Sequence, residues 1–197
     1  MESAAIRAFA PGELTAAQID ELARLHCECL PDSLFSRVGL GATRCLYRMM
    51  ARSSSEVFVL ATDANSLPVG ASVSSTAPDS LLRRLITGSA MSLWLALRFY
   101  RLPWSRLRDH QPAPFAPRPE LMFLFMRPDS RNEGAGARLV RATEQAMRAR
   151  AEKTLYVMTE DRPDNRALAF YRELGYQAVA KVRKFGVGFV LFGRPLG

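Results

Sequence analysis

The alternation of apolar and polar residues divides the first part of the chain into helix-like and strand-like segments. Residues 15–30 and roughly 40–52 repeat apolar positions every three or four residues, which predicts two amphipathic helices. Between them, "LPDSLFSRVG" carries turn residues and is interpreted as a turn. Residues 56–75 hold two short apolar runs separated by "ANSLP", which predicts a β-hairpin. Two helices followed by paired strands are therefore expected.

The second part of the chain opens on its most apolar strand-like run. Residues 120–128, "ELMFLFMRP", are typical of a central strand buried on both faces, and Pro128 should end it. From residue 137 onward the pattern changes to a helical one, and "TLYVMTE" reads as a further strand. The helix has an apolar stripe of Ala137, Leu139, Val140, Thr143 and Met147, with Arg138, Arg141, Glu144 and Arg148 expected on the opposite, polar side.

A shorter helix is predicted within "DNRALAFYRELGYQ", residues 164–177. Asp164 or Asn165 is suited to cap its start, and Gly175 supplies the left-handed residue that commonly ends a helix. Tyr171 is expected to point inward, because helical spacing puts it on one face with Ala167, Phe170 and Leu174.

Residues 79–116 break this regular order. The segment is rich in Leu, Trp, Phe and Tyr but carries several arginines, and "QPAPFAPRPE" follows it as a proline-rich connection. Its uncharged run is shorter than the roughly 18 residues that cross a bilayer. Two interpretations remain: a helix that lies on a membrane or covers a substrate, and a long core helix whose arginines reach solvent.

Length and charge bound the possible functions. The 197 residues, 48% of them hydrophobic, suit one domain spanning 1–197. The formal charge of +8 favours an anionic partner such as a phosphate-bearing cofactor, a nucleic acid or an acidic membrane, although a generally basic surface would explain it equally. The N-terminus has no basic segment followed by an apolar core, so no signal peptide is expected.

The cysteines point to a reducing compartment, and hence to the cytoplasm, because there are three of them without framework spacing. "HCEC", residues 26–29, suggests a metal site at first sight. On a helix, however, Cys27 and Cys29 point to different sides, so we expect no metal.

The stretch "RPDSRNEGAGARLV", residues 127–140, connects the apolar strand to the long helix. Gly134 and Gly136 would let backbone N–H groups approach a ligand, and the helix would direct its unpaired donors to the same point, which favours a phosphate. A Walker loop is excluded because Ala137-Arg138 follows Gly136, and a dinucleotide fingerprint is excluded because Leu139 stands where Gly or Ala is needed.

The same stretch resembles the Arg/Gln-x-x-Gly-x-Gly/Ala pyrophosphate loop of the GCN5-related N-acetyltransferases, the GNAT superfamily. Residues 164–177 are similar to the family's second signature, in which an Asn precedes a helix carrying Ala and Tyr and ending in Leu-Gly-Phe or Leu-Gly-Tyr. The motifs cover roughly residues 117–197. The resemblance implies an α/β (α+β) GNAT fold, a mixed central sheet flanked by helices, with an atypical helical insertion at about 79–116.

The resemblance also implies an acetyl-CoA-dependent N-acetyltransferase. Tyr171 would protonate the leaving thiolate, the Met126 backbone N–H would meet the oxyanion, and Glu120 stands where many members carry the general base. Glu120 could equally be a strand-edge carboxylate in solvent, and His26 is the other titratable candidate. The residues implied to bind coenzyme A are Leu124, Phe125, Met126, Arg131, Asn132, Gly134, Ala135, Gly136, Ala137, Asn165 and Tyr171.

Two departures from the family concern the substrates. Met126 replaces a small β-branched residue and would crowd or reshape the acetyl pocket, and the insertion would lie on the acceptor side. The expected acceptor is an amino sugar or another small amine. The alternative is a non-catalytic module that uses the insertion, residues 81–108, to contact an anionic membrane at its inner face or a nucleic acid. Nucleic acid is the less favoured partner because no aromatic-basic motif is present.

Overall fold

The computed structural model describes residues 4–87, 114–130, 134–184 and 186–197. Its centre is a seven-stranded sheet of order β1-β2-β3-β4-β5-β7-β6, in which only β4 and β5 run parallel. This mixed sheet confirms the predicted fold class. The strands are β1 (Ala5–Phe9), β2 (Glu56–Thr62), β3 (Pro68–Ser75), β4 (Glu120–Met126), β5 (Thr154–Glu160), β6 (Gln177–Lys184) and β7 (Val187–Pro195).

The described helices agree with most of the predicted ones. The α-helices are α1 (Ala16–Cys29), α2 (Leu34–Val38), α3 (Leu40–Ala51), α4 (Leu81–Thr87), α7 (Ala135–Ala149) and α8 (Arg166–Glu173), and the short 3₁₀ turns are η1 (Pro78–Ser80) and η2 (Pro128–Ser130). Helix α2 corrects the interpretation of "LPDSLFSRVG" as a turn: the Ser33 hydroxyl caps its first turn by accepting from the Ser36 N–H. Among the described helices, none is long and apolar enough to cross a membrane.

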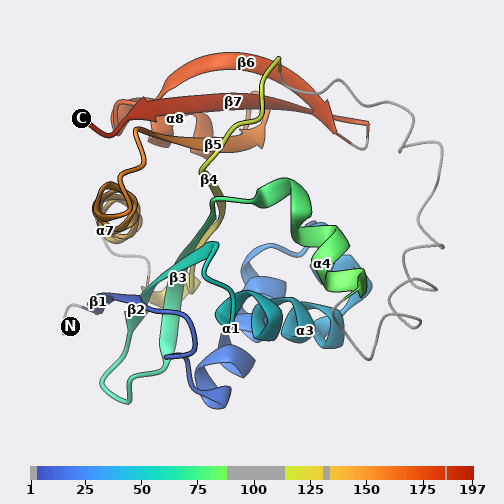
Figure 1. Ribbon diagram of the computed structural model, residues 1–197, viewed down its shortest axis with the longest axis vertical. Coiled ribbons are helices and arrows are strands. Elements are labelled where there is room, and N and C mark those ends of the chain that lie inside the picture. The colour runs from blue at the N-terminus through green and yellow to red at the C-terminus, as the bar shows by residue number, and fades with distance from the viewer. Residues whose placement is uncertain (1–3, 88–113, 131–133, 185) are drawn as a thin grey trace.

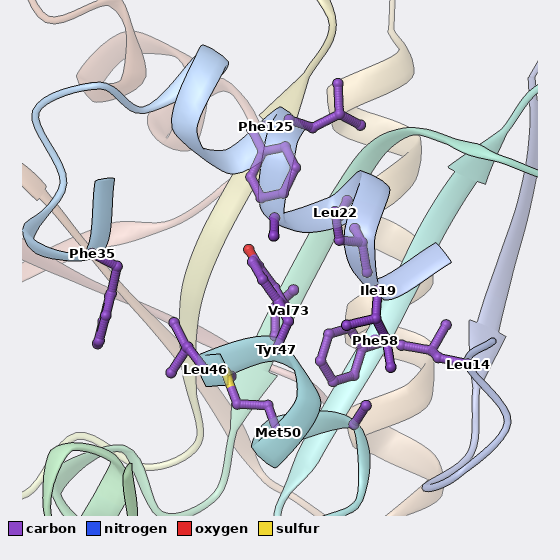
Figure 2. Close-up of a cluster of buried hydrophobic side chains, with 14 of the residues drawn as sticks. Leu14, Ile19, Leu22, Phe35, Leu46, Tyr47, Met50, Phe58, Val73 and Phe125 are labelled. Carbon is purple, nitrogen blue, oxygen red and sulfur yellow. The ribbon is translucent and has the colours of Figure 1, made fainter. Parts of the chain in front are cut away.

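The helices lie on two faces of the sheet and bury two separate cores (Figure 1). Helices α1, α3 and α4 pack on one face, and α7 crosses the other face over β1 to β4. Figure 2 shows the first core, where Tyr47 from α3 and Phe125 from β4 lie among aliphatic side chains. The second core holds the buried stripe of α7 together with Tyr171 of α8. Strand β4 contributes side chains to both cores, as expected for a central strand.

The ends of the atypical segment are fixed to the domain. Arg84 of α4 binds the buried Glu56 of β2, and Leu81 and Leu85 are buried in the first core. On the far side of the segment, Arg118 donates to Asp79 at 2.7 Å. Leu81 and Leu85 at its start are therefore core residues, whereas the predicted aromatic region from residue 94 to 104 lies outside the described residues.

Candidate active site

The two parallel strands at the centre of the sheet separate soon after they meet. Strand β4 pairs with β3 from Glu120 to Met126, but it pairs with β5 only at Glu120 and Leu121. The remainder of β4 therefore has a strand neighbour on one side only. In an opening of this kind, backbone donors and acceptors of the strand face the gap. At its end, the Met126 carbonyl accepts from the Cys29 thiol at 3.3 Å.

The register identifies which backbone groups turn toward this opening. The Arg127 N–H donates to the Val69 carbonyl at 2.8 Å, and hydrogen-bonded pairs alternate along an antiparallel ladder. Phe125 therefore directs its N–H toward β3, whereas Leu124 and Met126 direct theirs toward the β5 side. Met122 is an extra residue in β4, a bulge that puts two consecutive side chains, Met122 and Phe123, against the first core.

The bulky Met126 side chain fits because residue 70 opposite it is glycine. A Cβ at Gly70 would lie 2.0 Å from the Met126 sulfur and 3.0 Å from the Phe125 carbonyl oxygen. Met126 is buried in the second core. Its side chain therefore packs against Gly70 of β3.

The start of α7 is preceded by a glycine. Gly134 precedes the helix in the left-handed conformation, with φ of 83°, and its place at the cap leaves α7 without a side-chain capping bond. The Arg138 N–H is bonded to the Gly134 carbonyl, so the earlier N–H groups of Ala135, Gly136 and Ala137 stand at the open end. Predicted ligands Arg131 and Asn132 lie outside the described residues.

Helix α8 begins and ends as predicted. The Asn165 Oδ1 accepts from the Ala167 N–H at 3.1 Å, and Gly175 follows the helix with φ of 85°. The Asn165 Nδ2 also donates to the Thr159 hydroxyl and the Glu160 carbonyl, at 2.9 and 2.7 Å. Asn165 thus ties α8 to the end of β5, and these contacts occupy the amide that the resemblance assigns to coenzyme A.

Tyr171 is buried in the second core at 5% exposure, as its spacing predicted. Its ring contacts Phe170, Tyr176 and Phe192, with centroids 5.2, 5.6 and 6.2 Å away. Burial raises the pKa of the Tyr171 hydroxyl above its ordinary value, so the phenol stays protonated at neutral pH. Met126 belongs to the same core, which connects this tyrosine with the end of β4.

Glu120 lies at the other end of β4, where the strand is paired on both sides. Its nearest strand partners are Ser75 on β3 and Tyr156 on β5. Glu120 is 8% exposed, so the expectation of a solvated strand-edge carboxylate is wrong. Burial raises its pKa to about 7, Lys184 opposes this rise, and Asp79 adds to it. A carboxylate with this pKa can exchange protons near neutral pH.

His26 is a buried core residue whose ring is held by two hydroxyl groups. The ring is fully buried, and its two nitrogens lie 2.8 Å from the Tyr47 hydroxyl and 2.7 Å from the Ser33 hydroxyl. Burial lowers the pKa of His26 to about 4, which keeps it neutral.

The neighbouring thiols point to different partners: Cys27 contacts Thr43, and Cys29 donates to the Met126 carbonyl. Within the described ranges, no three His, Cys, Asp or Glu side chains group as metal ligands would.

The helical pattern placed Glu144 of α7 on the wrong side of the helix. Glu144 was expected on the polar side but is 2% exposed, and its Oε1 accepts from the Tyr176 hydroxyl and from Arg194, each at 3.0 Å. Both partners lie far along the chain, so the helical pattern could not reveal them. Glu144 therefore joins α7 to the region around α8.

Comparison with known proteins identifies this architecture. Residues 95–176 match the model of the acetyltransferase (GNAT) family, a match that begins inside the atypical segment and ends at Tyr176. Solved acetyltransferase structures, one of them described as of the GNAT family, superpose on nearly the whole chain. The chain has the GNAT fold. The family resemblance of the two motifs is thus confirmed.

Three solved structures illustrate the likeness. An aminoglycoside 6'-N-acetyltransferase complexed with coenzyme A is 15% identical, with TM-score 0.65, over 98% of this chain and 97% of that one. An aminoglycoside 6'-acetyltransferase type Ii is 17% identical, with TM-score 0.63 and the same coverage. An acetyltransferase from Thermus thermophilus is 17% identical, with TM-score 0.57, over 99% of both chains. No curated protein sequence matches the chain significantly.

Proposed function

We propose that this protein is an acetyl-CoA-dependent N-acetyltransferase that acts on an amino sugar or another small amine. The observation that carries the proposal is the opening between β4 and β5, beyond which the chain continues to the start of α7, with Gly134 at its N-cap. The coenzyme A bound in the aminoglycoside 6'-N-acetyltransferase structure described above supports the same use of this fold. The continuous sheet from Ala5 to Pro195 supports the further proposal that residues 1–197 work as one catalytic domain.

The donor would be held by backbone groups. The N–H groups of Gly136 and Ala137, at the positive end of the α7 dipole, suit the pyrophosphate, together with Arg131 and Asn132 of the same motif. Gly134 and Ala135 belong to the same cradle. Of the backbone groups from Leu124 to Met126, those of Leu124 and Met126 face the opening and would pair with the amides of the pantetheine arm. Asn165, whose amide binds Thr159 and Glu160, would line the far side of the cofactor.

The donor supplies an activated acyl group on a thiol of moderate acidity. The backbone N–H of Met126, or that of Leu124, which points the same way, would stabilise the negative charge that develops on the carbonyl oxygen of the acyl group. Glu120 lies at the other end of β4 from Met126 and would therefore take the proton of the amine through intervening water; its pKa of about 7 lets it be partly ionised at neutral pH while remaining basic. Tyr171 would donate the hydrogen bond or proton that the departing sulfur needs, because it remains a neutral phenol.

The test combines binding with turnover. We expect calorimetry to detect binding of coenzyme A. We also expect a thiol assay to detect release of free coenzyme A from acetyl-CoA in the presence of an aminoglycoside, glucosamine, spermidine or a lysine-containing peptide. Tyr171→Phe should lower kcat by about 10²- to 10³-fold while coenzyme A still binds, because the acid is lost and the ring is kept. Tyr47→Phe is the matched control, since it deletes a buried hydroxyl from the other core.

Two results would contradict the proposal in different ways. Failure to bind coenzyme A would remove the donor, and therefore the reaction. Binding without thiol release across the amine panel would favour the alternative of a non-catalytic module.

A further inference from the structure

The end of α8 connects Tyr171 to Tyr176 through a defined helix-terminating motif. The Tyr176 N–H donates to the Tyr171 carbonyl, and the Gly175 N–H donates to the Arg172 carbonyl, both at 2.9 Å. These two bonds around a left-handed glycine form a Schellman motif, in which the residue after the glycine also contacts the helix residue whose carbonyl it caps. That contact is the edge-to-face packing of the two tyrosine rings, 5.6 Å apart.

Only the ring of Tyr176 is needed for this motif, so its hydroxyl requires a separate explanation. The hydroxyl donates to Glu144 at 3.0 Å, although both side chains are almost fully buried. Arg194 donates to the same carboxylate oxygen and also to the Leu174 carbonyl at the end of α8. Burying a carboxylate is costly unless it is paired and hydrogen-bonded, and here each of its contacts fixes the end of α8.

The network therefore holds α8 against α7 and β7. Glu144 belongs to α7, the helix whose first turn is proposed to bind the pyrophosphate, and Arg194 belongs to β7. The pantetheine arm that separates the pyrophosphate from the reacting sulfur has a fixed covalent length. An acid on α8 can meet that sulfur only if α8 keeps its position relative to α7, and a displacement of about 1 Å can cost a large factor in rate.

We propose that Tyr176, anchored by Glu144 and Arg194, is a positioning residue that sets the place of the Tyr171 hydroxyl. This inference rests on the proposed function, because it assigns the network a role in protonating the leaving thiolate. Tyr176 acts through Tyr171 and does not itself reach the reacting atoms.

A double-mutant cycle tests this dependence, with acetyl-CoA and the pooled amine panel as the probes. Tyr176→Phe should lower kcat by about tenfold and leave the KM for acetyl-CoA within about twofold. In the Tyr171→Phe background, the same substitution should have no further effect on kcat, because the group it positions is already gone. The control Tyr47→Phe should change kcat by one common factor in both backgrounds.

The possible outcomes are distinguishable. Equal losses from Tyr176→Phe in both backgrounds, or a raised KM with kcat unchanged, would overturn the inference and leave the proposed function intact. Absence of turnover in the wild-type protein, or indifference to Tyr171→Phe, would overturn the proposed role of Tyr171 and the inference together.

A second pair of variants covers the case in which Tyr176→Phe does not fold. Glu144→Gln keeps an oxygen that can accept from the Tyr176 hydroxyl, so it should retain kcat within about threefold, whereas Glu144→Ala should lose about tenfold. Equal losses from these two substitutions would contradict the proposal.

Discussion

Two buried glutamates lie in the same row of the sheet and have different partners. Glu56 on β2 and Glu120 on β4 both face Ser75 of β3, which lies between them. Glu56 accepts hydrogen bonds from Ser75 and from Arg84, which supplies a counter-charge. For Glu120, the described residues offer no such arginine, and burial raises its pKa to about 7. A buried carboxylate with an arginine partner stabilises a structure, whereas one without can exchange a proton.

The largest expected effect separates the two glutamates by activity. Glu120→Gln should lower kcat/KM by about 10²- to 10⁴-fold, because the base is lost, and should abolish the acid limb of the pH profile near pH 7. Glu56→Gln should keep turnover within about threefold. Steady-state rates of both variants and the wild type, measured between pH 5.5 and 9, test the loss of activity and the loss of the acid limb. A wild-type profile that is flat through pH 7, or equal losses in the two variants, would remove the distinction.

A second expected difference concerns stability and pH. Between pH 4.5 and about 7, folded Glu120 retains a proton that the unfolded chain releases, so its burial lowers the free energy of unfolding as the pH rises. The loss amounts to roughly 3 kcal/mol above pH 7. Glu120→Gln should therefore be more stable than the wild type at pH 8 by about 2–3 kcal/mol, and similar to it at pH 4.5. Urea unfolding at the two pH values measures this.

Glu56→Gln is the counterpart in the same measurement. It leaves Arg84 beside a neutral amide, and we expect it to lose about 1–3 kcal/mol at pH 8, less than for a fully buried pair because Arg84 is partly exposed. If Glu56→Gln instead gained stability at pH 8, the arginine partner would not explain the contrast.

The smallest effects come from charges around Glu120. Asp79→Asn should lower the pKa of Glu120 and move the acid limb to lower pH, whereas Lys184→Met should move it to higher pH. We expect changes of about two- to threefold in kcat/KM below pH 7, because solvent and salt screen partly exposed charges. Arg118→Gln serves as a control. Like Asp79→Asn, it breaks the ion pair between Arg118 and Asp79, but it keeps the negative charge of Asp79. Shifts in the same direction for Asp79→Asn and Lys184→Met would contradict the prediction.

The sequence could predict what depends on neighbouring residues. Apolar periodicity located α1, α3, α7 and the β2–β3 hairpin, because the pattern of each lies within one continuous stretch of sequence. The predicted left-handed Gly175 and the Asn165 cap were also confirmed, since both follow from local backbone requirements. The short strand β1 was not predicted, because it is a mostly exposed edge strand of five residues with little apolar pattern.

What the sequence could not predict depends on partners distant in the chain. The burial of Glu144 follows from Tyr176 and Arg194, 32 and 50 residues away. The separation of β4 from β5 depends on pairing between strands that lie far apart in the chain. The raised pKa of Glu120 likewise depends on how deeply neighbouring elements cover the start of β4. The roles assigned to the site residues stay predictions until the variants are measured.

The ion pair between Asp79 and Arg118 has a consequence for how such a protein can diversify. At 2.7 Å, it brings Asp79 and Arg118, at the two ends of this segment, side by side. Closing a loop between adjacent ends costs only about 0.6 kcal/mol more for each doubling of its length. Evolution can therefore lengthen, shorten or replace the residues between these ends with little thermodynamic penalty. Under the proposed function, such changes would alter the acceptor side, while the sheet and the start of α7 keep the proposed donor site.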